Sequence, residues 1–157
     1  MEKTLSVSIA AYNVAATLRE TLDPFVQSGV LDDLDIMIVD DGSKDTTADL
    51  AKEYQERFPS SIRLIQKENG GWGSTVNTGI EYAVGKYFKQ LDGDDYYSPE
   101  NLPQYLEMLK KHNSDLVITP YITYDDLTKA VITVENCNPG YPLETELLLK
   151  DVHNFGP

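Results

Sequence analysis

Three carboxylates gather within four positions of the chain, at Asp92, Asp94 and Asp95, with Gly93 after the first. Like charges this close repel one another unless a cation lies between them. The preceding residues Tyr87–Leu91 predict a buried β-strand, which would place the carboxylates at a strand end. Carboxylate oxygens are preferred ligands of Mg²⁺ and Mn²⁺, and such a cation commonly holds a phosphate that acidic side chains would repel. The alternative interpretation is an acidic turn, because Asp and Gly both favour turns.

A second acidic cluster, Asp40–Ser43, follows the apolar run Ile36–Val39. This run is apolar at every position, which is typical of a strand buried on both faces in a parallel sheet. A carboxylate at its end, such as Asp41, can accept hydrogen bonds from a base N–H or from ribose hydroxyls. The alternative is a helix start capped by Ser43 or Asp45, with acidic side chains near the positive end of the helix dipole. The two interpretations are compatible.

The glycine-rich loop Asn69–Gly73 leads into a predicted helix. Backbone N–H groups at such a helix start can bind an anion. The loop matches neither the GxxxxGK nor the GxGxxG pattern, so the alternative is a connector in which Trp72 is a packing residue. Asn77 and Gly79 on the helix are candidates for a donor and a close-approach position, or else ordinary helix surface.

The elements that must position these clusters alternate along the chain. Apolar runs predict strands, and periodic apolar stripes between caps and Gly or Pro stops predict helices. Pro24 is expected to kink the first helix or end it early. The predicted strands are Leu5–Ala10, Ile36–Val39, Ile62–Ile65, Tyr87–Leu91 and Leu116–Thr119. The predicted helices run from a cap at Asn13 to Ser28, from Ser43 or Asp45 to Phe58, from the glycine loop to Gly85, from a cap at Ser98 past Leu109, and over Glu144–Val152. A β-hairpin is predicted from Tyr121–Tyr124 and Ala130–Val134.

Strands that alternate with helices indicate βαβ units and an α/β fold with a mostly parallel sheet. In such folds a ligand binds beyond the carboxyl ends of the strands, where the strand order reverses. Polar clusters follow each of the first four predicted strands, at Tyr12–Asn13, Asp40–Ser43, Asn69–Gly73 and Asp92–Asp95. The sequence therefore predicts one site at one edge of the sheet.

Composition narrows the class of protein. The 157 residues suit one domain, with 41% hydrophobic and 25% charged residues. A formal net charge of −13 argues against nucleic acid as a partner, since phosphates need a basic surface. Cys137 is the single cysteine, which excludes an internal disulfide and favours a reducing, cytoplasmic setting. The sequence contains no apolar run long enough for a transmembrane segment.

In series, these motifs resemble the family 2 glycosyltransferases, which have the GT-A fold, a Rossmann-like nucleotide-binding sheet. The resemblance covers roughly residues 5–120. The motifs that carry it are Ser6–Asn13, Ile38–Ser43, Asn69–Gly71 with Asn77–Gly79, and Leu91–Asp95. It implies a metal-dependent, inverting transfer of a sugar from a nucleotide-sugar, most often a UDP-sugar, to the hydroxyl of a saccharide or lipid-linked acceptor. The products of such enzymes include cell-surface polysaccharides and glycolipids made at the inner face of a membrane.

The resemblance also implies roles for particular residues. Mn²⁺ or Mg²⁺ would be bound by Asp94 and Asp92, with Asp94 as the direct ligand. Asp95 would assist or cap the next turn. The implied nucleotide-binding residues are Ala10, Tyr12, Asn13, Asp40, Asp41, Gly71, Asn77, Asp92 and Gly93.

The chain departs from the family pattern at three points. Ala10 stands where proline is frequent, and Val76 stands where arginine often reaches the nucleotide; Ser74 and Thr75 are candidate replacements for that contact. The family's general base lies well downstream of the metal motif, and we expect it beyond Pro157, in a chain truncated at its C-terminus. Two alternatives remain. A sugar-nucleotide pyrophosphorylase would need a basic, glycine-rich loop in place of Ala11–Val14, and a non-catalytic binding domain would need no base.

Overall fold

A computed structural model describes residues 2–125, 128 and 130–135 of the chain. The described chain forms two compact units, with the boundary after Lys111. The predicted helix over Glu144–Val152 lies outside the described residues, as does Cys137. That all 157 residues form one domain stays a prediction.

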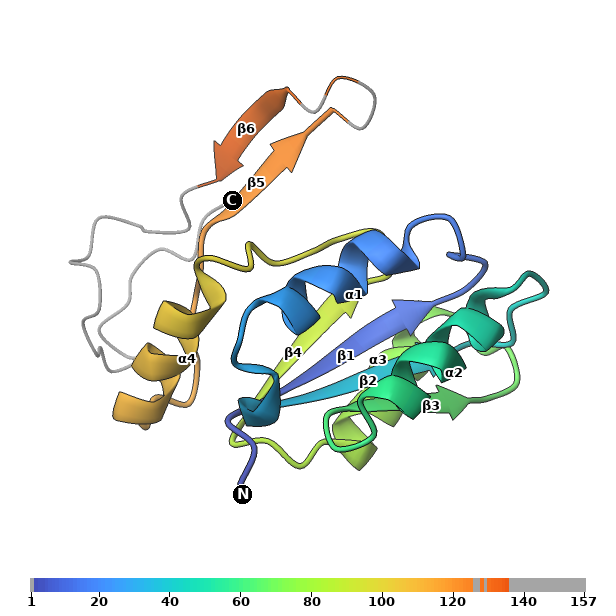
Figure 1. The fold of residues 1–157 in the computed structure, drawn as a ribbon, viewed down its shortest axis with the longest axis horizontal. Coiled ribbons are helices and arrows are strands. Elements are labelled where there is room, and N and C mark those ends of the chain that lie inside the picture. The colour runs from blue at the N-terminus through green and yellow to red at the C-terminus, as the bar shows by residue number, and fades with distance from the viewer. Residues whose placement is uncertain (1, 126–127, 129, 136–157) are drawn as a thin grey trace. The chain divides into compact units, whose positions relative to one another are not determined.

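The first unit is a four-stranded parallel sheet flanked by helices, which confirms the predicted α/β class (Figure 1). The strand order is β3-β2-β1-β4. In Figure 1, α1 and α2 lie in front of the sheet and α3 lies behind it. The elements are β1 (Leu5–Ala11), α1 (Leu18–Gln27), the 3-10 helix η1 (Leu31–Asp33), β2 (Leu34–Asp40), α2 (Thr47–Arg57), β3 (Ile62–Gln66), α3 (Trp72–Tyr82), β4 (Tyr87–Asp92) and α4 (Leu102–Lys111).

The two central strands, β1 and β2, form the core because helices cover both of their faces. All seven residues of β2 are buried, as its run of apolar residues predicts. On the front face α1 contributes Leu18, Leu22 and Phe25, which are fully buried. On the back face α3 approaches β1 closely at Gly79, where a Cβ atom would lie 2.5 Å from Ser8 Cβ. Glycine is therefore required at this crossing.

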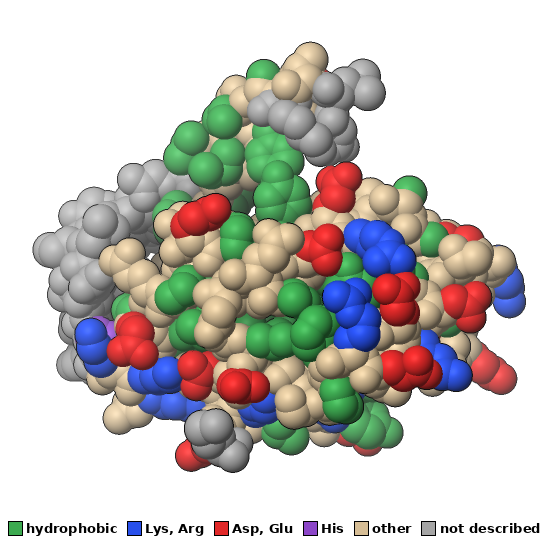
Figure 2. Space-filling model, viewed as in Figure 1, with side chains coloured by type: hydrophobic (Ala, Val, Ile, Leu, Met, Phe, Trp, Pro, Cys, Tyr) green, Lys and Arg blue, Asp and Glu red, His purple; other side chains and the backbone are tan. Residues whose placement is uncertain are grey.

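The outer surface carries charges of both signs. Figure 2 shows Asp and Glu side chains interspersed with Lys and Arg over the face on which α1 and α2 lie. Arg19 of α1, for example, donates to Glu53 of α2 at 2.9 Å. Lys and Arg side chains form no continuous stripe on the face that Figure 2 shows.

The predicted start of the first helix is wrong. Asn13 has a left-handed φ of 55° and lies in the loop after β1, while α1 begins at Leu18. A turn closed by hydrogen bonds from the N–H groups of Thr17 and Leu18 to the carbonyl of Val14 precedes the helix. The side chain of Asn13 is engaged by the neighbouring loop and is not available as a cap. The helix continues past Pro24 to Gln27, so Pro24 does not end it early.

Two strand predictions also need correction. The strand at Tyr87–Leu91 exists as β4, but it is an edge strand with exposed residues, including Phe88, because among the described residues only β1 pairs with it. Leu116–Thr119 does not form a strand; Leu116 and Ile118 are exposed, and no described strand pairs with this segment. Both predictions were based on apolar content alone, which does not determine whether a segment is buried or paired in a sheet.

The second unit contains the predicted hairpin. Strands β5 (Tyr121–Tyr124) and β6 (Val131–Glu135) pair antiparallel, with Tyr121 opposite Glu135. None of the helices within the described ranges is long and apolar enough to cross a lipid bilayer.

Candidate functional site

The strand order reverses between β1 and β4, since the chain runs from β1 outward to β3 and then returns to the other side of β1. A reversal of this kind opens a crevice at the carboxyl ends of the strands. The register places Asp40 beside Ala11, and Asp92 beside Ala10 on the opposite side of β1. The two acidic motifs, 52 residues apart in the chain, therefore flank one strand end, as the sequence predicts.

The carboxylate of Asp41 holds the glycine-rich loop. It accepts hydrogen bonds from the N–H groups of Gly70 at 2.9 Å and Gly71 at 2.8 Å, and the Lys67 ammonium donates to it at 2.6 Å. The side-chain amide of Asn69 donates to the Asp41 carbonyl at 3.0 Å. Asp41 is only 3% exposed, so these donors replace water. In this structure Asp41 fixes the loop next to the edge of the sheet; a direct contact to a nucleoside stays a prediction.

Opposing influences set the pKa of Asp41. Burial alone would raise it, but the Lys67 ammonium and the two glycine N–H groups outweigh burial and hold the pKa below its ordinary value. Asp41 therefore stays ionised at neutral pH, and its charge stabilises the loop.

Asn13 and Asp40 join the loops that follow β1 and β2. The N–H of Asn13 donates to Ser43 Oγ at 3.0 Å, and its side-chain oxygen accepts from the N–H of Lys44 at 2.7 Å. Asp40, which is buried, accepts from the N–H of Ser43 at 3.0 Å and so closes the turn after β2. Asp45 accepts from the N–H of Thr47 at 3.0 Å, but the N-cap of α2 is Thr46, so the predicted caps Ser43 and Asp45 are wrong.

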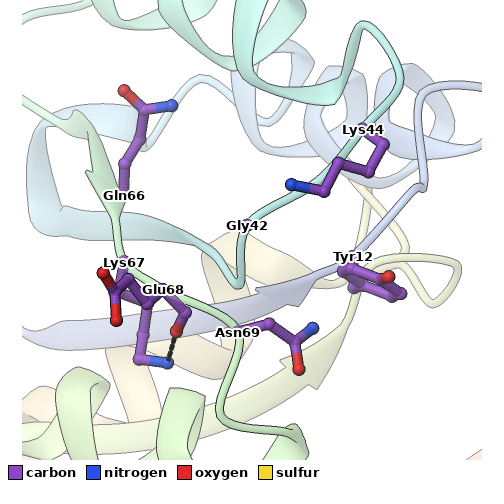
Figure 3. A pocket seen from close by; sticks show the side chains of 7 residues that line it. All are labelled: Tyr12, Gly42, Lys44, Gln66, Lys67, Glu68 and Asn69. Atoms are coloured by element: carbon purple, nitrogen blue, oxygen red, sulfur yellow. Dashed lines mark hydrogen bonds between the residues drawn. The ribbon is translucent and has the colours of Figure 1, made fainter.

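An open pocket of about 540 Å³ lies beside these loops (Figure 3). The half-exposed ring of Tyr12 stands at one side, and the Lys44 side chain extends toward the space between Gly42 and Gln66. The pocket thus combines an aromatic face with hydrogen-bonding groups of both kinds, a combination that suits a planar polar ring. Its lining residues are Tyr12, Gly42, Lys44, Gln66, Lys67, Glu68 and Asn69.

Two hydroxyl groups, from Thr17 just before α1 and from Thr21 within it, hold the turn of the acidic motif after β4. Thr17 and Thr21 donate to the carbonyl of Gly93, at 2.8 and 3.1 Å. The N–H of Asp95 donates to the carbonyl of Asp92 at 3.1 Å and closes the turn. A Cβ atom at Gly93 would lie 2.9 Å from the carbonyl oxygen of Ala10, so the turn packs too closely against β1 for a larger residue.

The carboxylate oxygens of this turn suit Mg²⁺ or Mn²⁺ as part of the ligand set, the rest of which would come from a substrate and water. Asp92 and Asp94 are exposed and offer hard oxygen ligands. The pKa of Asp95 is raised by partial burial and by the charges of Asp94 and Asp92. The described residues contain no group of three or more His, Cys, Asp or Glu side chains that could hold a metal ion. Mg²⁺ sites built on one or two carboxylates take their remaining ligands from substrate phosphates and water, and this turn fits that type.

One contact at the site was missed by the sequence analysis. Trp72, which only the alternative interpretation of the loop named, as a packing residue, is 60% exposed, and its indole Nε1–H donates to Asp92 Oδ1 at 2.7 Å. No local sequence signal reveals this pair, since 20 positions separate the two residues.

The remaining residues that were predicted to bind the nucleotide lie in different places around the strand ends and on α3. Gly71 has a φ of 80° and donates to Asp41, and Ala10 lies in β1 beside Asp92. Asn77 is exposed on α3 and is not part of the pocket lining. Among the candidate replacements for a nucleotide contact, Ser74 lies within 3.4 Å of Asp41, whereas Thr75 is buried and donates to the Trp72 carbonyl.

Proteins of known sequence match this chain. An uncharacterized glycosyltransferase of Rickettsia prowazekii is 36% identical over 115 residues, which are 73% of this chain and 35% of the relative. The minor teichoic acid biosynthesis protein GgaB of Bacillus subtilis is 31% identical over 114 residues, 72% of this chain and 13% of that protein. The chain thus spans about a third or less of the length of these relatives.

Solved structures share the fold. Residues 1–349 of TarS from S. aureus, in complex with UDP-GlcNAc, align with a TM-score of 0.64 and 26% identity over 71% of this chain and 32% of that one. The mannosyltransferase PcManGT from Pyrobaculum calidifontis, in complex with GDP-Man and Mn²⁺, aligns with a TM-score of 0.60 and 23% identity over 70% of this chain, which supports the fold alone. These are GT-A neighbours, as the sequence resemblance implies.

The model of the family described as glycosyl transferase family 2 matches residues 6–155, nearly the whole chain. The matched residues include the sequence motifs and the parallel sheet at whose edge these motifs lie. The chain belongs to glycosyl transferase family 2.

Proposed function

We propose that this chain binds a nucleotide-sugar through a divalent cation and forms the donor-binding part of an inverting glycosyltransferase. The observation that carries the proposal is the convergence of two features at one strand end. The pocket beside Tyr12 and the acidic turn at Asp92–Asp95 lie on the two sides of the end of β1.

The pocket side is proposed to bind the nucleoside. Tyr12 offers an aromatic face to a base, while Lys44, Gln66 and Asn69 supply hydrogen-bonding groups. Asp41 keeps the loop that carries Asn69 in place. A uridine nucleotide is the first candidate, because TarS, at 26% identity, has been crystallised with UDP-GlcNAc.

The acidic turn is proposed to bind the diphosphate through Mg²⁺ or Mn²⁺, with Asp94 and Asp92 as ligands. The cation would supply positive charge to the diphosphate leaving group. Thr17 and Thr21 fix the turn against α1, so the carboxylates are positioned before the ligand arrives. The expected acceptor is a saccharide or lipid-linked hydroxyl, and its deprotonation requires a general base. A role in cell-surface polymers has support from the teichoic acid relative; action at the inner face of a membrane stays a prediction.

Calorimetric titration of UDP in the presence of Mn²⁺, repeated with excess chelator, tests the proposal. We expect binding that requires Mn²⁺ and that is lost in Asp94→Asn. The matched control is Asp32→Asn, which removes an exposed carboxylate from η1, just before the start of β2 and so at the opposite end of that strand from the site. Binding that survives the chelator or the Asp94 substitution would contradict the metal assignment, and stronger binding of GDP or dTDP would contradict the choice of uridine.

A further inference from the structure

Trp72 is held by the acidic motif and not by burial. Its side chain remains 60% exposed although it is the first residue of α3, and its Nε1–H donates to Asp92 Oδ1 at 2.7 Å. A large aromatic side chain is usually fixed by packing against apolar neighbours. Here a charge-assisted hydrogen bond, which is stronger than one between neutral groups, defines the position of the indole.

The pair also connects the two halves of the site. Gly70 and Gly71 are bound to Asp41 at the end of β2, and the next residue, Trp72, is bound to Asp92 at the end of β4. The segment Gly70–Trp72 is therefore fixed at both ends by carboxylates at the ends of two different strands. Since β1 lies between β2 and β4, this segment links strand ends on the two sides of β1.

We propose that Trp72 is a positioning residue for the divalent cation, a role that rests on the proposed function. The indole N–H engages Oδ1 of Asp92 and restricts the rotation of the carboxylate, which leaves Oδ2 as the oxygen presented to the cation. A ligand that is ordered in advance loses less conformational entropy on binding. Hydrogen-bond partners of metal ligands commonly change metal affinity by about 10- to 100-fold. Because Trp72 is exposed to water, the expected effect lies at the lower end, about 10-fold.

The test is the Mn²⁺ dissociation constant of the 157-residue chain in the presence of UDP, measured from the electron paramagnetic resonance signal of free Mn²⁺. Trp72→Phe removes the N–H donor and keeps an aromatic ring. We expect its Mn²⁺ affinity to fall about 10-fold with an unchanged melting temperature. Tyr82→Phe is the matched control, because it removes one hydroxyl from a half-exposed aromatic residue at the other end of α3, and its Mn²⁺ affinity should equal that of the wild type.

Fluorescence gives an independent readout, because Trp72 is the single tryptophan of the chain. Paramagnetic Mn²⁺ bound at Asp92 should quench its emission, whereas diamagnetic Mg²⁺ should not. Asp92→Asn keeps an oxygen acceptor for the indole but removes the charge. Mn²⁺ should no longer quench the emission of this variant, measured relative to its own emission without metal.

The outcomes separate the two proposals. Equal Mn²⁺ affinity in Trp72→Phe and in the wild type overturns the positioning role and leaves the donor site standing, provided that Asp94→Asn abolishes binding. If Asp92→Asn and Asp94→Asn both bind Mn²⁺ as the wild type does, the metal site itself is wrong and both proposals fall. Mn²⁺ that binds without quenching Trp72 also overturns the positioning role.

Discussion

Lys67 and Asp41 form an ion pair at the carboxyl edge of the sheet, with 2.6 Å between Nζ and Oδ1. The side chain of Asp41 is almost completely buried, and that of Lys67 is about one-fifth exposed. Neither residue's neighbours in the chain indicate this pairing, yet it determines where the glycine-rich loop lies. The pair is therefore the first target for mutation.

Lys67→Met should destabilise the protein by about 2 kcal/mol, because the buried charge of Asp41 loses its strongest donor. The two glycine N–H groups remain and limit the loss. Urea denaturation measures the change. Lys44→Met is the control: its ammonium forms no ion pair in the described part of the chain, and the free energy of unfolding should change by less than about 0.5 kcal/mol. Equal effects of the two substitutions would contradict the assigned role of Lys67.

The contribution of Asp41 to stability should depend on pH. Its pKa is lower in the folded protein than the ordinary value of 3.8, so the ionised carboxylate stabilises the fold above that value. This stability is lost as the pH falls through the lowered pKa. The difference in unfolding free energy between the wild type and Asp41→Asn should thus be largest near neutral pH and shrink below about pH 4. Other carboxylates with lowered pKa values cancel in this difference, and a pH-independent difference would exclude the charge as the cause.

Thr17 and Thr21 should show a non-additive effect, because both donate to the carbonyl of Gly93. Valine at either position removes one donor, and the remaining hydroxyl still satisfies the carbonyl, so each single variant should lose about 0.5–1 kcal/mol. The double variant leaves a buried carbonyl unpaired and should lose more than the sum of the two. Chemical denaturation of all four proteins measures the coupling. Additive losses would show that the two hydroxyls act independently.

Two glycines on α3 should respond in opposite directions to alanine. At Gly79 a Cβ atom would collide with Ser8 of β1, so Gly79→Ala should destabilise the protein by about 1–3 kcal/mol. At Gly73 nothing lies within 4 Å of the added Cβ, and alanine should stabilise the helix by about 0.5–1 kcal/mol. Thermal unfolding distinguishes the two cases. A similar change in both variants would mean that helix propensity and not the contact with β1 dominates.

Local sequence was sufficient for the elements whose signals are periodic and strong. The apolar run at Ile36–Val39 predicts a central strand, because only burial on both faces tolerates such a run. The hairpin at Tyr121–Tyr124 and the loop-to-helix transition after Asn69 were predicted on similar grounds. Local sequence was not sufficient at Asn13, which was named both as a helix cap and as a nucleotide-binding residue. Its hydrogen bonds to Ser43 and Lys44 in the neighbouring loop exclude the cap.

By itself the sequence determined the parallel α/β class and the placement of four polar clusters at one edge of the sheet, because parallel strands separated by helices must all end on the same side. The tertiary structure decided which side chains meet there. Asp41 with Lys67, Trp72 with Asp92, and Thr17 with Gly93 join residues that are 26, 20 and 76 positions apart. Such contacts depend on strand order and helix packing, which no local pattern of residues encodes.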